Sequence, residues 1–207
     1  MGRDTGAKCR QCRREGEKLF LKGERCYTRS CGLTRKAKTP GEGPKRHRPR
    51  RSQYQLHLRE KQKARRIYGL REQQFRNYVD WAKRRKGATG ETLLTLLECR
   101  MDNMVYRAGF ASSRQQARQM ITHGHFELNG RAVNIPSTLL RMGDVVAVKE
   151  GRRERVKPLI DAAVGRDAPA WLERNADAMR FQVIAMPNIE QTGLNIAVNL
   201  IVEFYSR

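Results

Sequence analysis

The chain has 207 residues, of which 39% are hydrophobic, and this suits one or two domains with a modest core. It contains no run of about 18 apolar residues and no secretory signal at its N-terminus, so we expect neither a transmembrane helix nor export. The formal net charge is +22, which exceeds what solubility requires and predicts a polyanionic partner.

The excess charge lies in the first part of the chain. Residues 1–90 contain 28 Lys and Arg against 8 Asp and Glu, whereas residues 91–207 contain 15 against 13. The resulting net charge of +20 in the first segment would make it repel itself if it stayed free. We therefore expect it to bind nucleic acid. An anionic membrane is second, because the charges do not follow one face of an amphipathic helix.

Four of the five cysteines form two pairs near the N-terminus, spaced Cys9-x2-Cys12-x13-Cys26-x4-Cys31. Without an export signal, thiolate chemistry is expected rather than disulfides. Four thiolates at this spacing are typical of a closed tetrahedral site that holds structural Zn²⁺. An iron–sulfur cluster would use the same ligands, and four reduced structural thiols are the remaining alternative. The fifth cysteine, Cys99, is expected to be a packing residue within a helix.

Residues 39–51, TPGEGPKRHRPRR, contain three prolines, which exclude regular secondary structure. We expect an extended tract that follows a phosphate backbone, and a disordered basic tail is the alternative. The cationic candidates in this tract are Lys45, Arg46, His47, Arg48, Arg50 and Arg51.

Two helices are predicted next, over residues 52–69 and 70–87, and Ser52 is a suitable N-cap for the first. An apolar set recurs at helical spacing in the second helix, and we expect it to face the core rather than to form a base-stacking platform. This set is Phe75, Tyr78, Val79 and Ala82. The basic candidates for nucleic-acid binding on the other faces are Arg65, Arg66, Arg84, Arg85 and Lys86.

Residues 91–150 predict the order helix, helix, hairpin, strand. The elements are helices over 91–109 and 112–124, a hairpin over 125–135 and a strand over 145–150. Ser112 and Ser113 are candidate caps for the second helix. Alternating apolar and polar residues flank Asn129-Gly130, a strong signal for a two-residue type I′ turn.

The second helix and the hairpin of this region carry a polar edge. Arg114 and Arg118 are four residues apart and share the outer face of the predicted helix. Further donors follow at the helix end and on the hairpin: Gln115, His123, His125, Asn129 and Arg131. Such a convex edge suits an RNA groove or junction. A metal site at His123 and His125 is disfavoured, because no Cys or cluster of carboxylates nearby could complete it.

Residues 151–207 predict a short helix over 156–165, a turn at 167–171 and strands over 180–187 and 194–207. The last of these is almost continuously apolar, so we expect it to be a buried strand.

The stretch RMDNMVYRAGFASSRQQARQMITHGHFELNGRAVNIPS, residues 100–137, resembles the RNA-binding module named for ribosomal protein S-four, an αL-type fold. The segments LREKQKARRIYGLREQQFRN and LIVEFYSR resemble the bacterial small-subunit (30S) ribosomal protein S-four family, so the resemblance extends over essentially the whole chain. The cysteine pattern is similar to that of the metal-bearing subgroup of this family.

The resemblance implies a structural role in the small ribosomal subunit. It implies early binding of 16S rRNA at a multi-helix junction of the 5′ domain, which nucleates assembly, and a contribution to translational accuracy. It also implies contact with ribosomal protein S-five and other small-subunit proteins. By position, Arg46, Arg48, Arg50 and Arg51 would line the path by which mRNA enters the subunit.

The expected fold class is α+β. A helical basic N-terminal part with a small four-cysteine metal site precedes an αL-type RNA-binding module on a small mixed sheet. The expected segments are residues 1–51, 52–90, 91–150 and 151–207.

RNA-modifying enzymes can carry the same module, but only 57 residues follow it here and no catalytic motif is recognisable. A zinc-containing DNA-binding regulator would need a recognition helix beside the cysteines, and an RNA-binding chaperone would be shorter. We expect no catalytic residues, no small-molecule substrate and a cytoplasmic location in the ribosome.

Overall fold

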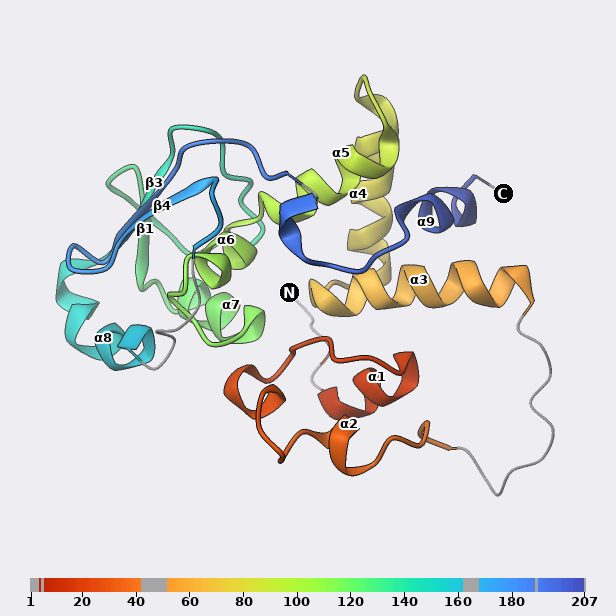
Figure 1. Cartoon of the computed structure of the whole chain (residues 1–207). Coiled ribbons are helices and arrows are strands. Elements are labelled where there is room, and N and C mark those ends of the chain that lie inside the picture. The colour runs from red at the N-terminus through yellow and green to blue at the C-terminus, as the bar shows by residue number, and fades with distance from the viewer. Residues whose placement is uncertain (1–3, 5, 42–51, 162–167, 189, 207) are drawn as a thin grey trace. The chain divides into compact units, whose positions relative to one another are not determined.

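In the computed structural model, the described residues are 4, 6–41, 52–161, 168–188 and 190–206 (Figure 1). The chain divides into two compact units, one of residues 1–93 with 195–207 and one of residues 94–194. Among the described residues, every helix is too short or too polar to cross a membrane.

The first unit is helical. Its elements are α1 (Lys8–Glu15), α2 (Gly32–Arg35), α3 (Gln53–Ile67), α4 (Glu72–Arg84), α9 (Val198–Phe204) and the start of α5 (Thr89–Glu98). The predicted cap of α3 is confirmed, since Ser52 Oγ accepts a hydrogen bond from the backbone N–H of Gln55 at 3.3 Å. The predicted core face of α4 is also confirmed, because its four apolar residues are at most 3% exposed.

The prediction of a strand over residues 194–207 is wrong, because Val198–Phe204 form helix α9. The apolar residues of this stretch are so dense that they fit a helical period as well as an alternating one, and tertiary packing decides between the two. Ile201 is fully buried, and Val198 touches Gly90 so closely that a Cβ on that glycine would lie 2.7 Å from Val198 Cγ1.

Helix α9 lies alongside α3 (Figure 1), and Tyr205, which follows α9, contacts α4. His57 Nε2 of α3 is 3.2 Å from Glu203 Oε2. The Lys61 ammonium lies 4.5 Å from the centre of the Phe204 ring, an attractive cation–π contact. At the start of α4, a carboxylate oxygen of Glu72 accepts a hydrogen bond from the hydroxyl of Tyr205 at 2.8 Å. The C-terminal segment therefore completes the first unit.

The second unit combines helices with an antiparallel sheet. Its elements are α6 (Met101–Arg107), α7 (Arg114–Thr122), β1 (Phe126–Leu128), β2 (Arg131–Val133), β3 (Val145–Val148), α8 (Arg153–Asp161), β4 (Leu172–Asn175) and β5 (Arg180–Val183). The strand order is β2-β1-β3-β5-β4, and all four pairings are antiparallel rather than mixed. The expected α+β class is confirmed.

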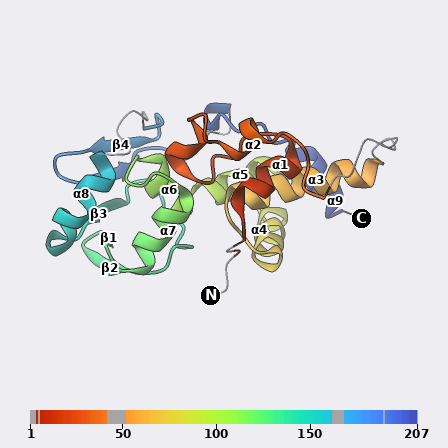
Figure 2. The same ribbon diagram turned by 90° about the horizontal axis from the view of Figure 1, so that it is seen from below.

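The predicted hairpin is present, and Figure 2 shows α7 leading into it. β1 pairs with β2 in register Leu128↔Arg131, so Asn129 and Gly130 form the turn. Their φ angles are 50° and 76°, as a type I′ turn requires. The predicted cap of α7 is confirmed as well, because Ser113 Oγ accepts a hydrogen bond from the N–H of Gln116 at 3.3 Å.

The helix predicted over residues 91–109 is interrupted, which corrects the expectation of one continuous helix. α5 ends at Glu98 and α6 begins at Met101. Between them the backbone extends and pairs with a later segment: Leu140 donates to the Cys99 carbonyl and Met101 donates to the Thr138 carbonyl, both at 2.8 Å. These tertiary hydrogen bonds replace helical ones, and the helical apolar spacing gave no sign of them.

One face of the sheet is buried under helices. Phe126, Val146 and Phe181 belong to one hydrophobic cluster with residues of α6, α7 and α8. The predicted helix over 156–165 is confirmed as far as Asp161, and residues 162–165 lie outside the described part of the chain. Strand β4 was not predicted, because its sequence LERN offers a single buried apolar residue, Leu172.

We predict that Phe126→Ala lowers the free energy of unfolding by about 3–5 kcal/mol, because Phe126 is 0% exposed and the truncation leaves a cavity in the core. Chemical denaturation followed by circular dichroism measures this. Ile135→Ala, at a side chain that is 53% exposed, is the control and should change stability by less than about 0.5 kcal/mol. Equal effects of the two variants would contradict the assigned core.

Candidate nucleic-acid interface

The structure brings the four N-terminal cysteines to one small pocket. Cys9 and Cys12 lie one turn apart on α1, Cys26 ends a short 3-10 helix, and Cys31 caps α2. A Cβ on Gly32 would lie 2.7 Å from the Cβ of Cys9, so glycine permits the close approach of α2 to α1. Within the described ranges, no group of three or more Cys, His, Asp or Glu side chains has the geometry of a formed metal site.

Backbone N–H groups surround the sulfur atoms of this pocket. The N–H of Lys22 donates to Cys26 Sγ at 3.4 Å. Burial raises the pKa of the Cys12 thiol, and repulsion from the three other cysteines adds to the increase. At Cys31 burial acts in the same direction, but hydrogen bonds from Thr34 and Leu33 outweigh it and lower the pKa of that thiol. The pocket therefore holds four interacting thiols with donors for thiolate sulfur.

A buried carboxylate at the end of α1 links the region of the cysteine pocket to α3. The side chain of Glu15, at the end of α1, is 3% exposed and forms ion pairs with Arg66 and, at 3.4 Å, with Arg59. Burial raises the pKa of Glu15, and the two guanidinium groups counter this effect. The candidate Arg66 is thus engaged within the protein, and Arg65 Nε lies 3.8 Å from Glu72.

Arg84, Arg85 and Lys86 differ from these residues. They follow one another at the C-terminal end of α4, and all three are exposed. In the part of the chain that the structure describes, none of the ion pairs involves them. Among the described residues of the first unit, they form one cluster of exposed cations.

The predicted candidates at residues 45, 46, 48, 50 and 51, together with His47, lie outside the described residues. Their role in binding RNA stays a prediction.

A buried ionic network in the second unit engages Arg118, another predicted site residue. Arg100 is fully buried and forms a two-point ion pair with Asp102, at 3.0 and 2.7 Å. Asp102 Oδ2 also accepts a hydrogen bond from Arg118 at 3.1 Å. One carboxylate thus binds two guanidinium groups, and the Arg118 side chain is only 14% exposed.

Arg114 is held in a similar way. Its Nε donates to Asn103 Oδ1 at 2.7 Å, and its guanidinium lies 4.6 Å from the centre of the Tyr106 ring. Asn103 in turn donates to the carboxylate of Glu98, which also receives two hydrogen bonds from Arg107. Arg114 and Arg118 are thus neighbours on α7, but both are mostly occupied inside the unit.

The two histidines lie at the junction of α7 and β1. His123 caps the helix and is exposed, and its ring centre lies 6.3 Å from that of His125. His125 Nδ1 is buried without a hydrogen-bond partner in the described residues. Burial lowers the pKa of His125, and the charges of Arg152, His123 and Arg155 lower it further.

Arg152 and Arg155 were missed by the sequence analysis. They lie at the end of the 3-10 turn Glu150–Arg152 and on the first turn of α8, and both are exposed. The basic run RRERVK at residues 152–157 was a signal for them, but only the fold places it beside His125.

The remaining predicted residues of this edge differ in availability. Arg131 is exposed on β2 and Gln115 is half-buried on α7. The Asn129 amide is already used, since it donates to Asp144 Oδ1 and accepts from the N–H of Val145, each at 2.9 Å. Asn129 therefore fixes the hairpin against β3.

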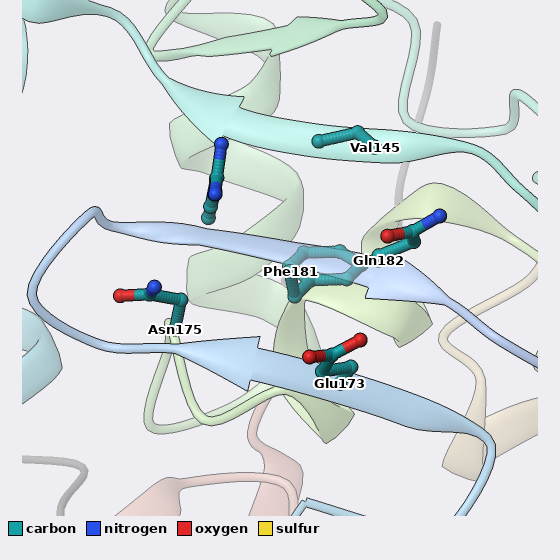
Figure 3. Close-up of a pocket in the computed structure, with 6 residues that line it drawn as sticks. Val145, Glu173, Asn175, Phe181 and Gln182 are labelled. Carbon is teal, nitrogen blue, oxygen red and sulfur yellow. The ribbon is translucent and has the colours of Figure 1, made fainter.

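The other face of the sheet carries a shallow pocket (Figure 3). Figure 3 shows Glu173 and Asn175 on β4 beside Gln182 on β5, with Val145 across from them on β3. Arg180 also lines the pocket, so one acidic side chain and one basic side chain face it. This balanced charge does not favour a polyanion.

Comparison with known proteins gives matches along the chain. Residues 3–98 match the model of the ribosomal protein S4/S9 N-terminal domain, and residues 99–146 match that of the S4 domain. The chain is 53% identical to small ribosomal subunit protein uS4 of Pelotomaculum thermopropionicum and 52% identical to that of Clostridioides difficile. It is 53% identical to small ribosomal subunit protein uS4A of Symbiobacterium thermophilum. Each alignment covers 100% of both chains.

We predict that Asp102→Ala lowers the free energy of unfolding by about 3–5 kcal/mol, because it leaves the fully buried Arg100 without its counter-ion. Thermal and urea unfolding measure the change. Asp80→Ala, at an exposed acid on α4, should shift stability by no more than about 0.5 kcal/mol. A small effect at Asp102 would show that the network does not hold the second unit together.

Proposed function

The chain belongs to the family of small ribosomal subunit protein uS4, and on that basis we propose that it binds 16S rRNA at a multi-helix junction of the 5′ domain and nucleates subunit assembly. It is a structural protein of the small subunit with an RNA-binding S4 domain, and it is not an enzyme. We place it in the ribosome, in the cytoplasm.

The observation that carries this proposal is the net charge of +20 in residues 1–90. Neutralising phosphates releases the counterions condensed on RNA, and this drives binding. The exposed cations Arg84, Arg85 and Lys86 have no acidic partner in the described residues that would compete with phosphate. The first unit therefore contributes affinity for RNA.

The second unit supplies a shaped edge. His123, His125 and Arg131 lie at the end of α7 and on the hairpin, and Arg152 and Arg155 extend this edge. A-form RNA displays phosphates and 2′-hydroxyls to such donors. We propose that this edge fixes the orientation of the protein on the junction. We propose that Arg114 and Arg118 also contact RNA at this edge, while their guanidinium groups are bound to Glu98 and Asp102.

We also propose that the cysteine pocket binds Zn²⁺, with an iron–sulfur cluster as the alternative metal group. The donor set supports this, because Cys9, Cys12, Cys26 and Cys31 line one pocket and backbone N–H groups face its sulfur atoms. The metal would cross-link the segment around this pocket, whose own hydrophobic core is small. Among the described residues 6–41, the buried apolar side chains are Cys12, Leu19, Leu21, Cys26 and Cys31.

Further partners follow from the family. We propose contact with ribosomal protein S-five and other small-subunit proteins, a contribution to translational accuracy, and contact of Arg46, Arg48, Arg50 and Arg51 with mRNA where it enters the subunit.

Electrophoretic mobility shifts on a 16S 5′-domain fragment, measured across a salt series, test RNA binding. We expect tighter binding than to an unrelated structured RNA at moderate salt. Replacing Arg84, Arg85 and Lys86 with Ala should reduce the slope of log K against log salt by roughly 2–3, because each lost phosphate contact removes about 0.7–0.9.

The matched control replaces Arg84 and Arg85 with Lys, which keeps the charge and should keep the slope. Equal affinity of the wild-type protein for both RNAs would overturn the proposal.

The RNA affinity should also rise as the pH falls from about 8 to about 6. In the free protein, burial and the neighbouring cations hold the pKa of His125 below its ordinary value of 6.5. Phosphate beside the ring stabilises the imidazolium, so binding raises this pKa and takes up a proton. His125→Asn should remove part of the pH dependence in filter-binding assays at constant ionic strength. An unchanged pH profile in this variant would exclude RNA phosphate next to His125.

Metal content gives a separate test. We expect about one Zn²⁺ per chain by elemental analysis, and we expect Cys26→Ser to lose it. Hydrogen exchange should then increase in residues 6–41 but not in residues 94–194, because the pocket lies within the first unit. Cys99→Ser, at a cysteine outside the pocket, serves as the control. A wild-type protein without metal and with equal protection in both variants would contradict the metal proposal.

A further inference from the structure

The two tryptophans of the chain have opposite environments. Trp171 is 2% exposed in the core of the second unit, whereas Trp81 on α4 is 46% exposed. The buried face of α4 is already complete without Trp81, since Phe75, Val79 and Ala82 are fully buried. The indole is therefore only half buried against α4, and a partner that covered its remaining apolar surface would gain free energy.

Two arginines follow the exposed indole at the C-terminal end of α4. Helical spacing places Asn77 and Arg84 within about 60° of Trp81 around α4, and Arg85 follows as the C-cap of the helix, whereas the acidic neighbour Asp80 lies about 100° away. Arg84 and Arg85 are exposed, and the ion pairs of the described residues leave them out. Along α4, the charged side chains closest in angle to Trp81 are thus arginines and not acids.

The indole is also oriented. Its ring packs edge-on against Tyr78, with ring centres 5.2 Å apart and an angle of 77° between the ring planes. Tyr78 is 3% exposed and belongs to the core face of α4, so it is a fixed support. An edge contact of this kind holds the indole while leaving ring surface open to solvent.

We infer that Trp81 is a stacking platform for an unpaired nucleobase of RNA, and that Arg84 and Arg85 bind the phosphates next to that base. This inference rests on the proposed binding of 16S rRNA and adds a site of a different chemical kind. An aromatic face beside cations is the combination by which proteins hold single-stranded RNA segments, since every base has a π face and every nucleotide a phosphate. An apolar protein partner would gain little from the surrounding guanidinium groups.

Tryptophan fluorescence of the whole protein tests the inference directly. Trp81→Phe retains only Trp171, so the difference between the wild-type and variant spectra reports on Trp81. We expect an oligouridylate of about ten nucleotides and the 16S 5′-domain fragment to quench the Trp81 signal and to protect it from acrylamide. A fully paired RNA duplex of the same length should quench it much less.

Affinity gives a second readout. Trp81→Ala should weaken binding to the 16S fragment by about 5- to 100-fold, and Trp81→Phe should recover most of this loss, because phenylalanine also stacks. Met142→Ala, at an apolar side chain that is 69% exposed in the second unit, should leave binding unchanged. Position 81 lies outside the core, so circular dichroism of the three variants should match the wild type.

The outcomes separate this inference from the proposed function. If the fragment binds tightly but Trp81 is not quenched and Trp81→Ala binds equally well, the inference is wrong and rRNA binding stands. If Trp81 becomes protected only when other small-subunit proteins are added, the indole contacts protein and the inference is also wrong. If the wild-type protein binds the 16S fragment no more tightly than an unrelated structured RNA, the proposed function is wrong, and the inference that rests on it loses its basis.

Discussion

The buried ion pair between Arg100 and Asp102 is the interaction on which the second unit depends. Arg100 is 0% exposed, and an unpaired charge there would cost several kcal/mol. Asp102 binds Arg118 of α7 as well as Arg100, so one carboxylate fixes α6 against α7. The same stretch of chain breaks the helix and pairs with residues 136–140. The position of the hairpin that follows α7 is therefore set by charge pairing as well as by apolar packing.

The two units differ in how far their own acidic side chains neutralise their positive charges. In the second unit, Glu98 and Asp102 pair with the arginines of α6 and α7, and the residual charge is small. In the first unit Glu15 and Glu72 pair with cations of α3, while the end of α4 stays exposed and basic. The second unit is thus balanced by its own acids, and the first depends on a polyanion to offset its self-repulsion.

Local signals in the sequence were reliable where a short motif determines the backbone. Ser52, Ser113 and the Asn129-Gly130 turn were predicted and are present, because capping and positive φ are properties of a few neighbouring residues. Helix α9 and the break before α6 were not predicted, since partners distant in sequence decide them. The predicted edge of α7 shows the same limit: the spacing placed Arg114 and Arg118 together, but not the acids that bind them.

The docking of α9 on α3 has a consequence for biosynthesis. Residues 195–207 belong to the first unit but are translated after the whole second unit. During vectorial synthesis, His57 and Lys61 lack their partners Glu203 and Phe204 until that segment emerges. The second unit can fold while the basic N-terminal part is still incomplete. The first unit is thus complete only after residues 195–207 have been translated, although most of its residues are translated before the second unit.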